Sequence, residues 1–137
     1  MAALAFKIRN DLNDLRGVSV ATTEFLESNG ASPEAIFAAN LAIEEMVSNT
    51  IKYGYSDGLQ HPIEIEVLCG GTALEIEIRD DGRQFDPCAY PPPSPTPLGD
   101  ELKAGGLGIH FVRNMLDGFN YARREGQNIV KLTKRLE

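Results

Sequence analysis

Membrane and metal-site signals are missing from this sequence of 137 residues. No apolar run in it approaches the roughly 20 residues that a membrane-spanning helix needs. The N-terminal stretch carries Lys7 and Arg9 among its apolar residues, which is not typical of a signal peptide. The two cysteines, Cys69 and Cys88, lack the spacing of metal ligands. We therefore predict a cytoplasmic protein with reduced thiols and no membrane partner.

Positive charge is also scarce. The chain has 13 Lys and Arg residues against 20 Asp and Glu, which gives a net charge of -7. Nucleic-acid affinity depends on neutralising phosphates, so this balance predicts no direct nucleic-acid binding and suits a basic protein partner better. Two nucleotide-binding signatures are absent as well: no GxGxxG follows a strand in a βαβ unit, and no GxxxxGK followed by Ser or Thr occurs. The sequence signals neither a Rossmann site nor a P-loop.

What the sequence does contain is a series of clear strand and helix patterns. The predicted strands cover residues 4–9, 63–67, 74–79, 119–123 and 129–135, and the predicted helices cover about 11–29, 33–55 and 109–116. Turns are expected at Gly70-Gly71 and over residues 125–128. Helices and strands segregate along the chain, which predicts one α+β domain over residues 1–137. The expected architecture is a two-layer α/β sandwich with a mainly antiparallel mixed sheet and the helices on one face.

The helix predicted over residues 33–55 organises the rest. Its apolar stripe, which includes Ile43 and Val47, lies opposite Glu45 on a helical projection, while Asn49 and Lys52 fall within about 60° of Glu45. A carboxylate, a carboxamide and an ammonium brought under cover together need partners, because their burial alone is costly. A bound ligand with a metal ion is one such partner. A solvated polar row at the end of an ordinary core helix is the alternative.

Asp80 is the second unusual feature. The apolar phase of the strand over residues 74–79, continued by one step, reaches this acid. An inward-facing carboxylate at a strand end needs a hydrogen-bond donor. In the other interpretation the strand stops at Arg79, and Asp80 merely begins the Asp-Asp-Gly turn.

A proline-rich stretch and a glycine-rich turn follow. Residues 86–104 contain six of the eight prolines, so they form neither a central strand nor a helix interior. A loop of this length is usually functional, and a proline-rich recognition peptide is the alternative. Gly105, Gly106 and Gly108 then precede an apolar helix. Such a turn can place backbone N–H groups against phosphate, although glycines at a plain turn would look similar.

Three motifs stand in order along the chain: Glu45-x-x-x-Asn49, Asp80-x-Gly82 and Gly106-x-Gly108. Together, over roughly residues 36–117, they resemble the ATP-binding fold shared by gyrase B, sensor histidine kinases and MutL. Within that fold, the blocks EEMVSNTIKYGY, IRDDGRQFDP and GGLGIHFV resemble the bacterial anti-sigma-factor serine/threonine kinases.

The resemblance implies roles for these residues. Asn49 would bind Mg²⁺, which would bridge the ATP phosphates. Glu45 would be the general base; its neighbour Glu44 lies about 140° from Asn49 round the helix, whereas Glu45 is about 40° away. Asp80 would accept a hydrogen bond from the adenine amino group, and Gly82 would let the backbone approach the base.

The resemblance also implies an ATP lid at about residues 86–104. Phosphate contacts would come from the end of that lid and the turn after it, namely Lys103, Gly105, Gly106, Leu107 and Gly108. Lys52 would approach phosphate or remain a solvated lysine. Some relatives carry a basic residue where this chain has Ala104, which makes Lys103 the alternative contact. Tyr53 stands where many relatives have His, and His110 is expected on a helix surface.

As the resemblance implies, the protein would use ATP to phosphorylate a STAS-type antagonist protein and would hold a sigma factor when free, acting as a homodimer. A nucleotide-gated binding module without useful kinase activity is the alternative, favoured slightly by Ala104. A third reading is the catalytic domain of a histidine kinase. It ranks below the others, because the sequence leaves no room for a dimerisation and phosphoacceptor helix pair and has two histidines.

Overall fold

A computed structural model describes residues 1–89 and 106–136 of the chain. In chain order the described elements are β1 (Ala2–Arg9), α1 (Leu12–Ser28), α2 (Pro33–Tyr53), β2 (Pro62–Gly70), β3 (Ala73–Asp80), the 3-10 helix η1 (Pro87–Ala89), α4 (Gly106–Met115), β4 (Gly118–Arg124) and β5 (Gln127–Arg135). No helix in these two ranges has the length and apolarity needed to cross a membrane.

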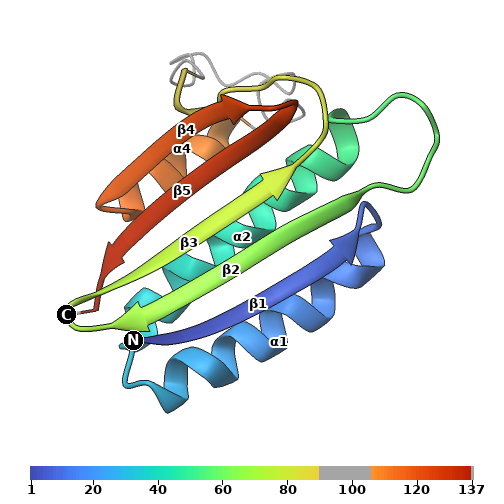
Figure 1. The fold of residues 1–137 in the computed structure, drawn as a ribbon. Helices are drawn as coiled ribbons and strands as arrows, with labels where there is room; N and C mark the ends of the chain where they lie inside the picture. Colours follow the sequence, from blue (N-terminus) through green and yellow to red (C-terminus); the bar gives the residue numbers. More distant parts are fainter. Residues whose placement is uncertain (90–105, 137) are drawn as a thin grey trace.

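The strands form one sheet in the order β1-β2-β3-β5-β4, and each described pair of neighbours is antiparallel. The helices α1, α2 and α4 cover one face of this sheet, and both termini lie at the end opposite the tip of β3 (Figure 1). The predicted α+β sandwich, with its helices on one face, is confirmed.

The core lies between the sheet and the helices. Along β2 and β3, every second side chain is buried, while the glutamates and Arg79 between them face outward. Ile43 and Val47 of α2 are buried as the helical projection predicts. Ala38 and Ala42, which the projection places on the side of Glu45, are buried too, because α1 packs against α2. The first half of α2 is therefore covered on both sides.

The start of α2 is set by local capping residues, and its end is joined to the turn after β3 by a tertiary hydrogen bond. Ser32 caps the helix by accepting a hydrogen bond from the N–H of Ala35 at 3.1 Å, and Pro33 takes the first helical position. The helix ends at Tyr53, two residues before its predicted end. There the carbonyl of Gly54 accepts a hydrogen bond from the N–H of Arg83 at 2.9 Å, which joins the end of α2 to the turn after β3.

Two strand ends decide between the sequence interpretations. Asp80 is the last residue of β3, 5% exposed, and pairs with Ile63 and Asn128 of the neighbouring strands. The interpretation that extends the apolar phase to Asp80 is confirmed.

The last hairpin differs from the prediction: Glu125 and Gly126 have positive φ angles and make a two-residue turn, so Asn128 lies in β5 rather than in the turn.

The proline-rich stretch is described only as far as residue 89, where η1 ends. Most of the predicted lid, with Lys103, Ala104 and Gly105, lies outside the described residues, as does the alternative of a proline-rich recognition peptide.

Candidate functional site

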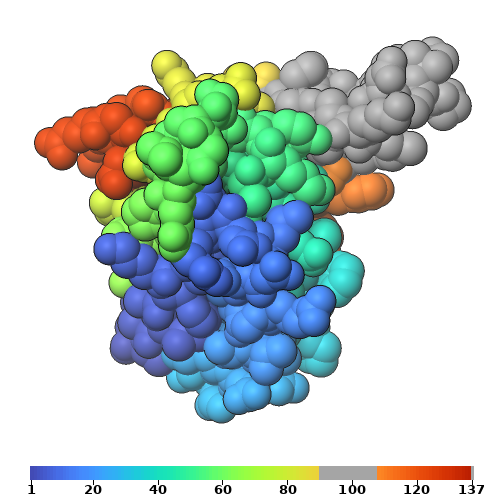
Figure 2. Space-filling view, turned by 90° about the vertical axis from the view of Figure 1, so that its right-hand side faces the viewer, coloured from blue at the N-terminus to red at the C-terminus, as the bar shows by residue number. Residues whose placement is uncertain are grey.

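A cavity of about 320 Å³ opens between the end of α2 and the sheet. Asn49 and Asp80 both line it, although they come from different layers of the sandwich. The remaining wall is mostly apolar and consists of Met46, Thr50, Tyr53, Gly54, Ile78, Arg83, Phe85, Pro87, Asn128 and Val130. At this end of the molecule the connection after α2, in green, lies against the segment after β3, in yellow (Figure 2).

One oxygen of Asp80 is committed to the protein. Its Oδ1 accepts hydrogen bonds from the N–H of Gly82 at 2.9 Å and from Nδ2 of Asn128 at 3.0 Å. Burial raises the pKa of Asp80, and these two hydrogen bonds act in the opposite direction. No hydrogen bond from a described residue reaches Oδ2. The carboxylate thus has a free acceptor at the wall of the cavity.

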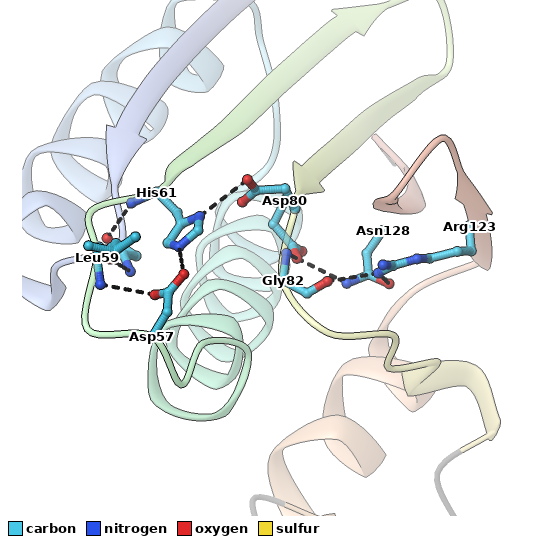
Figure 3. A network of polar contacts seen from close by, with 9 residues as sticks. Asp57, Leu59, His61, Asp80, Gly82, Arg123 and Asn128 are labelled. Carbon is cyan, nitrogen blue, oxygen red and sulfur yellow. Dashed lines mark hydrogen bonds and ion pairs between the residues drawn. The ribbon is translucent and has the colours of Figure 1, made fainter.

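Asn128 holds this carboxylate, and sequence reasoning missed it. Its Nδ2 also donates to the carbonyl of Arg83 at 2.8 Å, while its Oδ1 accepts from Tyr121 at 2.6 Å and from Nη1 of Arg123 at 3.0 Å. Figure 3 shows Asn128 and Arg123 on one side of Asp80 and Gly82. The signal that would have found Asn128 is the Glu-Gly pair, because a two-residue turn there places Asn128 in the strand.

The polar residues Glu45, Asn49 and Lys52 of α2 border a cavity and a groove. Asn49 faces the cavity, whereas Glu45 and Lys52 line a neighbouring groove of about 740 Å³ between α1 and α2. Burial raises the pKa of Glu45, and the Lys52 charge and the Asn49 side chain partly oppose that shift. The structure therefore brings the three predicted residues together, with Glu45 at the boundary. Glu44 also lines the groove but is exposed.

The beginning of α4 packs directly against Glu45. A Cβ atom placed on Gly108 would collide with the Glu45 carboxylate, so this position has room only for glycine while the carboxylate stays where it is. Gly106 and Leu107 are the first two residues of α4. The glycine-rich turn and the polar row of α2, which sequence reasoning treated as separate signals, are thus adjacent.

Gly82 serves a related purpose. A Cβ atom there would lie 2.9 Å from the carbonyl oxygen of Gly54 and 3.0 Å from Oδ1 of Asp80. Glycine at this position therefore lets the turn after β3 pack closely against the end of α2. His110, in contrast, lies on α4 beside Asn114, with 3.1 Å between its Nε2 and the Asn114 Nδ2, as expected for a residue near the helix surface.

The oxygen ligands at the cavity fit a magnesium ion that is bound jointly by the protein and by a ligand's phosphates. The described residues contain no group of three or more His, Cys, Asp or Glu side chains that would hold a metal by themselves. Mg²⁺ commonly binds through one or two protein oxygens together with substrate phosphates and water. The side-chain oxygen of Asn49 is such a ligand, so these residues fit an ion that arrives with a polyphosphate.

The two-layer sandwich, with its helices on one face of the sheet, is the fold of the histidine kinase-like ATPase domains. The catalytic domain of the histidine kinase ThkA superimposes with a TM-score of 0.51 at 16% identity, over 99% of this chain and 97% of that one. Residues 8–134 match the family described as the histidine kinase-like ATPase domain, and the chain belongs to this family.

Its relatives point to one branch of that family. The serine/threonine-protein kinase BtrW of Bordetella bronchiseptica is 31% identical over 71% of this chain and 68% of its own length. The anti-sigma F factor of Oceanobacillus iheyensis is 26% identical over 85% of this chain and 81% of its own. A crystal structure of the RsbU and RsbW domains of a Mycobacterium tuberculosis protein has a TM-score of 0.72 at 20% identity. It matches 99% of this chain, which spans 33% of that longer one.

Replacement of Asn128 should destabilise the fold. Asn128→Ala removes donors from Asp80 and Arg83 and acceptors from Tyr121 and Arg123, so the free energy of unfolding should fall by about 2 kcal/mol. Urea denaturation measures this change. Asn120→Ala, on the exposed surface of β4, is the matched control and should change stability little. Equal stability of the two variants would contradict the role assigned to Asn128.

Replacement of Gly108 should move the Glu45 carboxylate. In Gly108→Ala the new methyl group occupies the position of that carboxylate, and the flexible Glu45 side chain must turn toward water. The pKa of Glu45 should then fall toward the ordinary glutamate value, because burial is what raises it. Carbon-13 NMR titration of the Glu45 side chain measures this shift. Gly17→Ala, in open space on α1, should leave that pKa unchanged.

Proposed function

We propose that this chain is an ATP-dependent serine/threonine protein kinase that phosphorylates a STAS-type antagonist and binds a sigma factor when the antagonist is absent. The observation that carries the proposal is the meeting of Asn49 and Asp80 at one cavity, with Glu45 beside Asn49 and against Gly108. These residues come from three separate motifs, and the side chains of Asp80, Asn49 and Glu45 supply a hydrogen-bond acceptor for the base, a metal ligand and a proton acceptor.

Asp80 and Gly82 recognise adenine in this proposal. The exocyclic amino group of adenine donates to Oδ2 of Asp80, the oxygen that no described residue engages. The mostly apolar cavity wall then covers the base. Guanine presents a carbonyl oxygen in place of that amino group, so a carboxylate at this position favours adenine.

The phosphates extend toward α4. Asn49 holds the magnesium ion, which when bound neutralises charge on the transferring phosphoryl group. Backbone N–H groups of Gly106, Leu107 and Gly108, at the N-terminus of α4, bind the phosphates in this proposal. Lys52 is a further phosphate contact, and so are Lys103 and Gly105, which lie outside the described residues. In this proposal the lid over the nucleotide is the stretch that the sequence predicts, residues 86–104, most of which lies outside the described residues.

Glu45 acts as general base. A serine or threonine hydroxyl presented along the groove between α1 and α2 reaches Glu45, which accepts the hydroxyl proton. The bond from the hydroxyl oxygen to the γ-phosphorus forms while the bond to the β–γ bridging oxygen breaks, and ADP leaves. The partly buried position of Glu45 raises its pKa, which makes it a better proton acceptor than a glutamate with the ordinary pKa.

The partner assignment follows the relatives, several of which are named as serine-protein kinases or anti-sigma factors. The net charge of -7 suits a basic segment of a sigma factor. Homodimerisation and a cytoplasmic location remain predictions from the sequence.

A phosphotransfer assay tests the proposal. The protein, Mg²⁺ and labelled ATP are incubated with STAS-domain proteins from the same genome. We expect label on a serine or threonine of one of them, which would establish the kinase and its partner together. Confirmed ATP binding with no label on any of them would favour the nucleotide-gated binding module instead.

Three variants of α2 separate binding from transfer. Asn49→Ala should abolish Mg-ATP binding, because it removes the metal ligand. Glu45→Ala should retain binding and slow transfer by about 10²–10⁴-fold, the usual contribution of a general base. The neighbouring Glu44→Ala, on the exposed side, should behave like the parent protein. Parent-like binding and turnover in both Asn49→Ala and Glu45→Ala would mean that this helix is wrongly assigned.

A further inference from the structure

His61 joins the connection after α2 to the turn after β3. Its Nε2 lies 2.7 Å from a carboxylate oxygen of Asp57, and its Nδ1 lies 3.2 Å from one of Asp81. Asp81 stands directly between Asp80 and Gly82 in the sequence. Figure 3 shows His61 on the side of the Asp80–Gly82 turn opposite Asn128 and Arg123. The turn that carries the cavity carboxylate is thus held from two sides.

The rest of the His61 residue is fixed as well. Its ring stacks on Tyr55, with ring centroids 4.4 Å apart and an angle of 17° between the planes. Its backbone N–H donates to Oδ1 of Asn10 at 2.9 Å, and its carbonyl accepts from the N–H of Asn10 at 3.0 Å. Because the backbone is anchored to the turn between β1 and α1, the imidazole is held in place between Asp57 and Asp81.

The geometry around the imidazole favours its protonated form. Asp57 and Asp81 are the charged groups that face the ring, one from the α2–β2 connection and one from the turn after β3, while Asn10 contacts the backbone. An imidazolium donates from both nitrogens, whereas a neutral imidazole would present a lone pair to one of the two carboxylates. The hydrogen bonds to Asp57 and Asp81 raise the pKa of His61 in this setting.

The same turn forms part of the cavity wall. Gly54, Asp80 and Arg83 all line the cavity, and Arg83 donates its backbone N–H to Gly54. Burial of the Tyr55 hydroxyl raises the pKa of Tyr55, and the charges of Asp80 and Asp81 add to that rise. Because Asp81 directly follows Asp80 in the chain, a displacement of Asp81 would also displace the Asp80 carboxylate that lines the cavity.

We infer that His61, in its imidazolium form, is a positioning residue for nucleotide binding, because it holds Asp81 to Asp57 and so keeps the Asp80–Arg83 turn in place. This inference rests on the proposed nucleotide site. It adds a dependence of nucleotide affinity on pH, through a residue that lies outside the cavity lining and outside the three motifs.

The sign of this dependence follows from the pKa of His61. That pKa is raised above its ordinary value of 6.5. The imidazolium that is hydrogen-bonded to both carboxylates is therefore fully present below pH 6.5. It is lost as the pH rises through the raised pKa. The contribution of His61 to nucleotide affinity should therefore be greatest at about pH 6 and fall on the alkaline side.

Isothermal titration calorimetry with ADP and Mg²⁺, on the full chain between about pH 6 and pH 8.5, tests the inference. At about pH 6 the parent should bind ADP about five-fold more tightly than His61→Gln, which is the lower end of typical coupling between two sites. The ratio should approach one at high pH. Comparison at the same pH removes the titration of the ADP phosphates from the result.

His110→Gln is the matched control, because the sequence has two histidines and this one lies on α4. Its pH profile should follow that of the parent. A profile of His61→Gln that also follows the parent would overturn the inference while leaving the nucleotide site intact. Absence of ADP binding in the parent itself would instead overturn the proposed function, and this inference with it.

A measurement on the unaltered protein avoids any folding defect of the variant. Linkage requires that, if protonation of His61 favours ADP, then ADP raises the pKa of His61. A five-fold coupling corresponds to a rise of about 0.7 pH units. Proton–carbon NMR titration of the His61 ring, with and without saturating Mg-ADP, measures this rise. An unchanged pKa in protein that demonstrably binds ADP would overturn the inference.

Discussion

The buried carboxylate of Asp80 is the constraint around which this end of the molecule is built. A carboxylate that is 5% exposed is costly unless hydrogen bonds compensate its lost hydration. Asn128 and the N–H of Gly82 satisfy one of its oxygens, and Asn128 is itself fixed by Tyr121 and Arg123. The second oxygen has no partner among the described residues. A buried, oriented and half-satisfied acceptor is what a recognition site for a hydrogen-bond donor requires.

The proposed site also requires that backbone segments approach one another closely, and glycines make this possible. Gly82 allows the turn after β3 to lie against the carbonyl of Gly54 at the end of α2, and Gly108 allows α4 to begin against Glu45. Each contact joins elements that are distant in the sequence. As a result, the last turn of α2 contacts the turn after β3, and α2 contacts the start of α4 about two turns earlier. One helix therefore borders both ends of the proposed nucleotide site.

Polar contacts on either side of the turn after β3 differ in their chemistry. On the β5 side, the Asn128 carboxamide and the Arg123 guanidinium hold the turn by hydrogen bonds to Asp80 and to the carbonyls of Gly82 and Arg83. On the other side, the His61 imidazole is hydrogen-bonded to Asp57 and Asp81, and these two carboxylates raise its pKa above the ordinary value. The same turn is therefore held by amide and guanidinium groups on one side and by an imidazole between two carboxylates on the other.

The local elements follow from the sequence alone. Alternation of apolar residues with glutamates in β2 and β3, the Ser32-Pro33 start of α2 and the order of the elements specify an α+β sandwich, because these signals act within a few residues. The motifs on α2, β3 and α4 are equally local. The tertiary structure added the partners of each motif. Asn128 meets Asp80 through strand register, Glu45 meets Gly108 through the packing of α4 on α2, and His61 meets Asp81 because β2 pairs with β3. No local pattern marks such pairs, since each depends on how separate elements lie side by side.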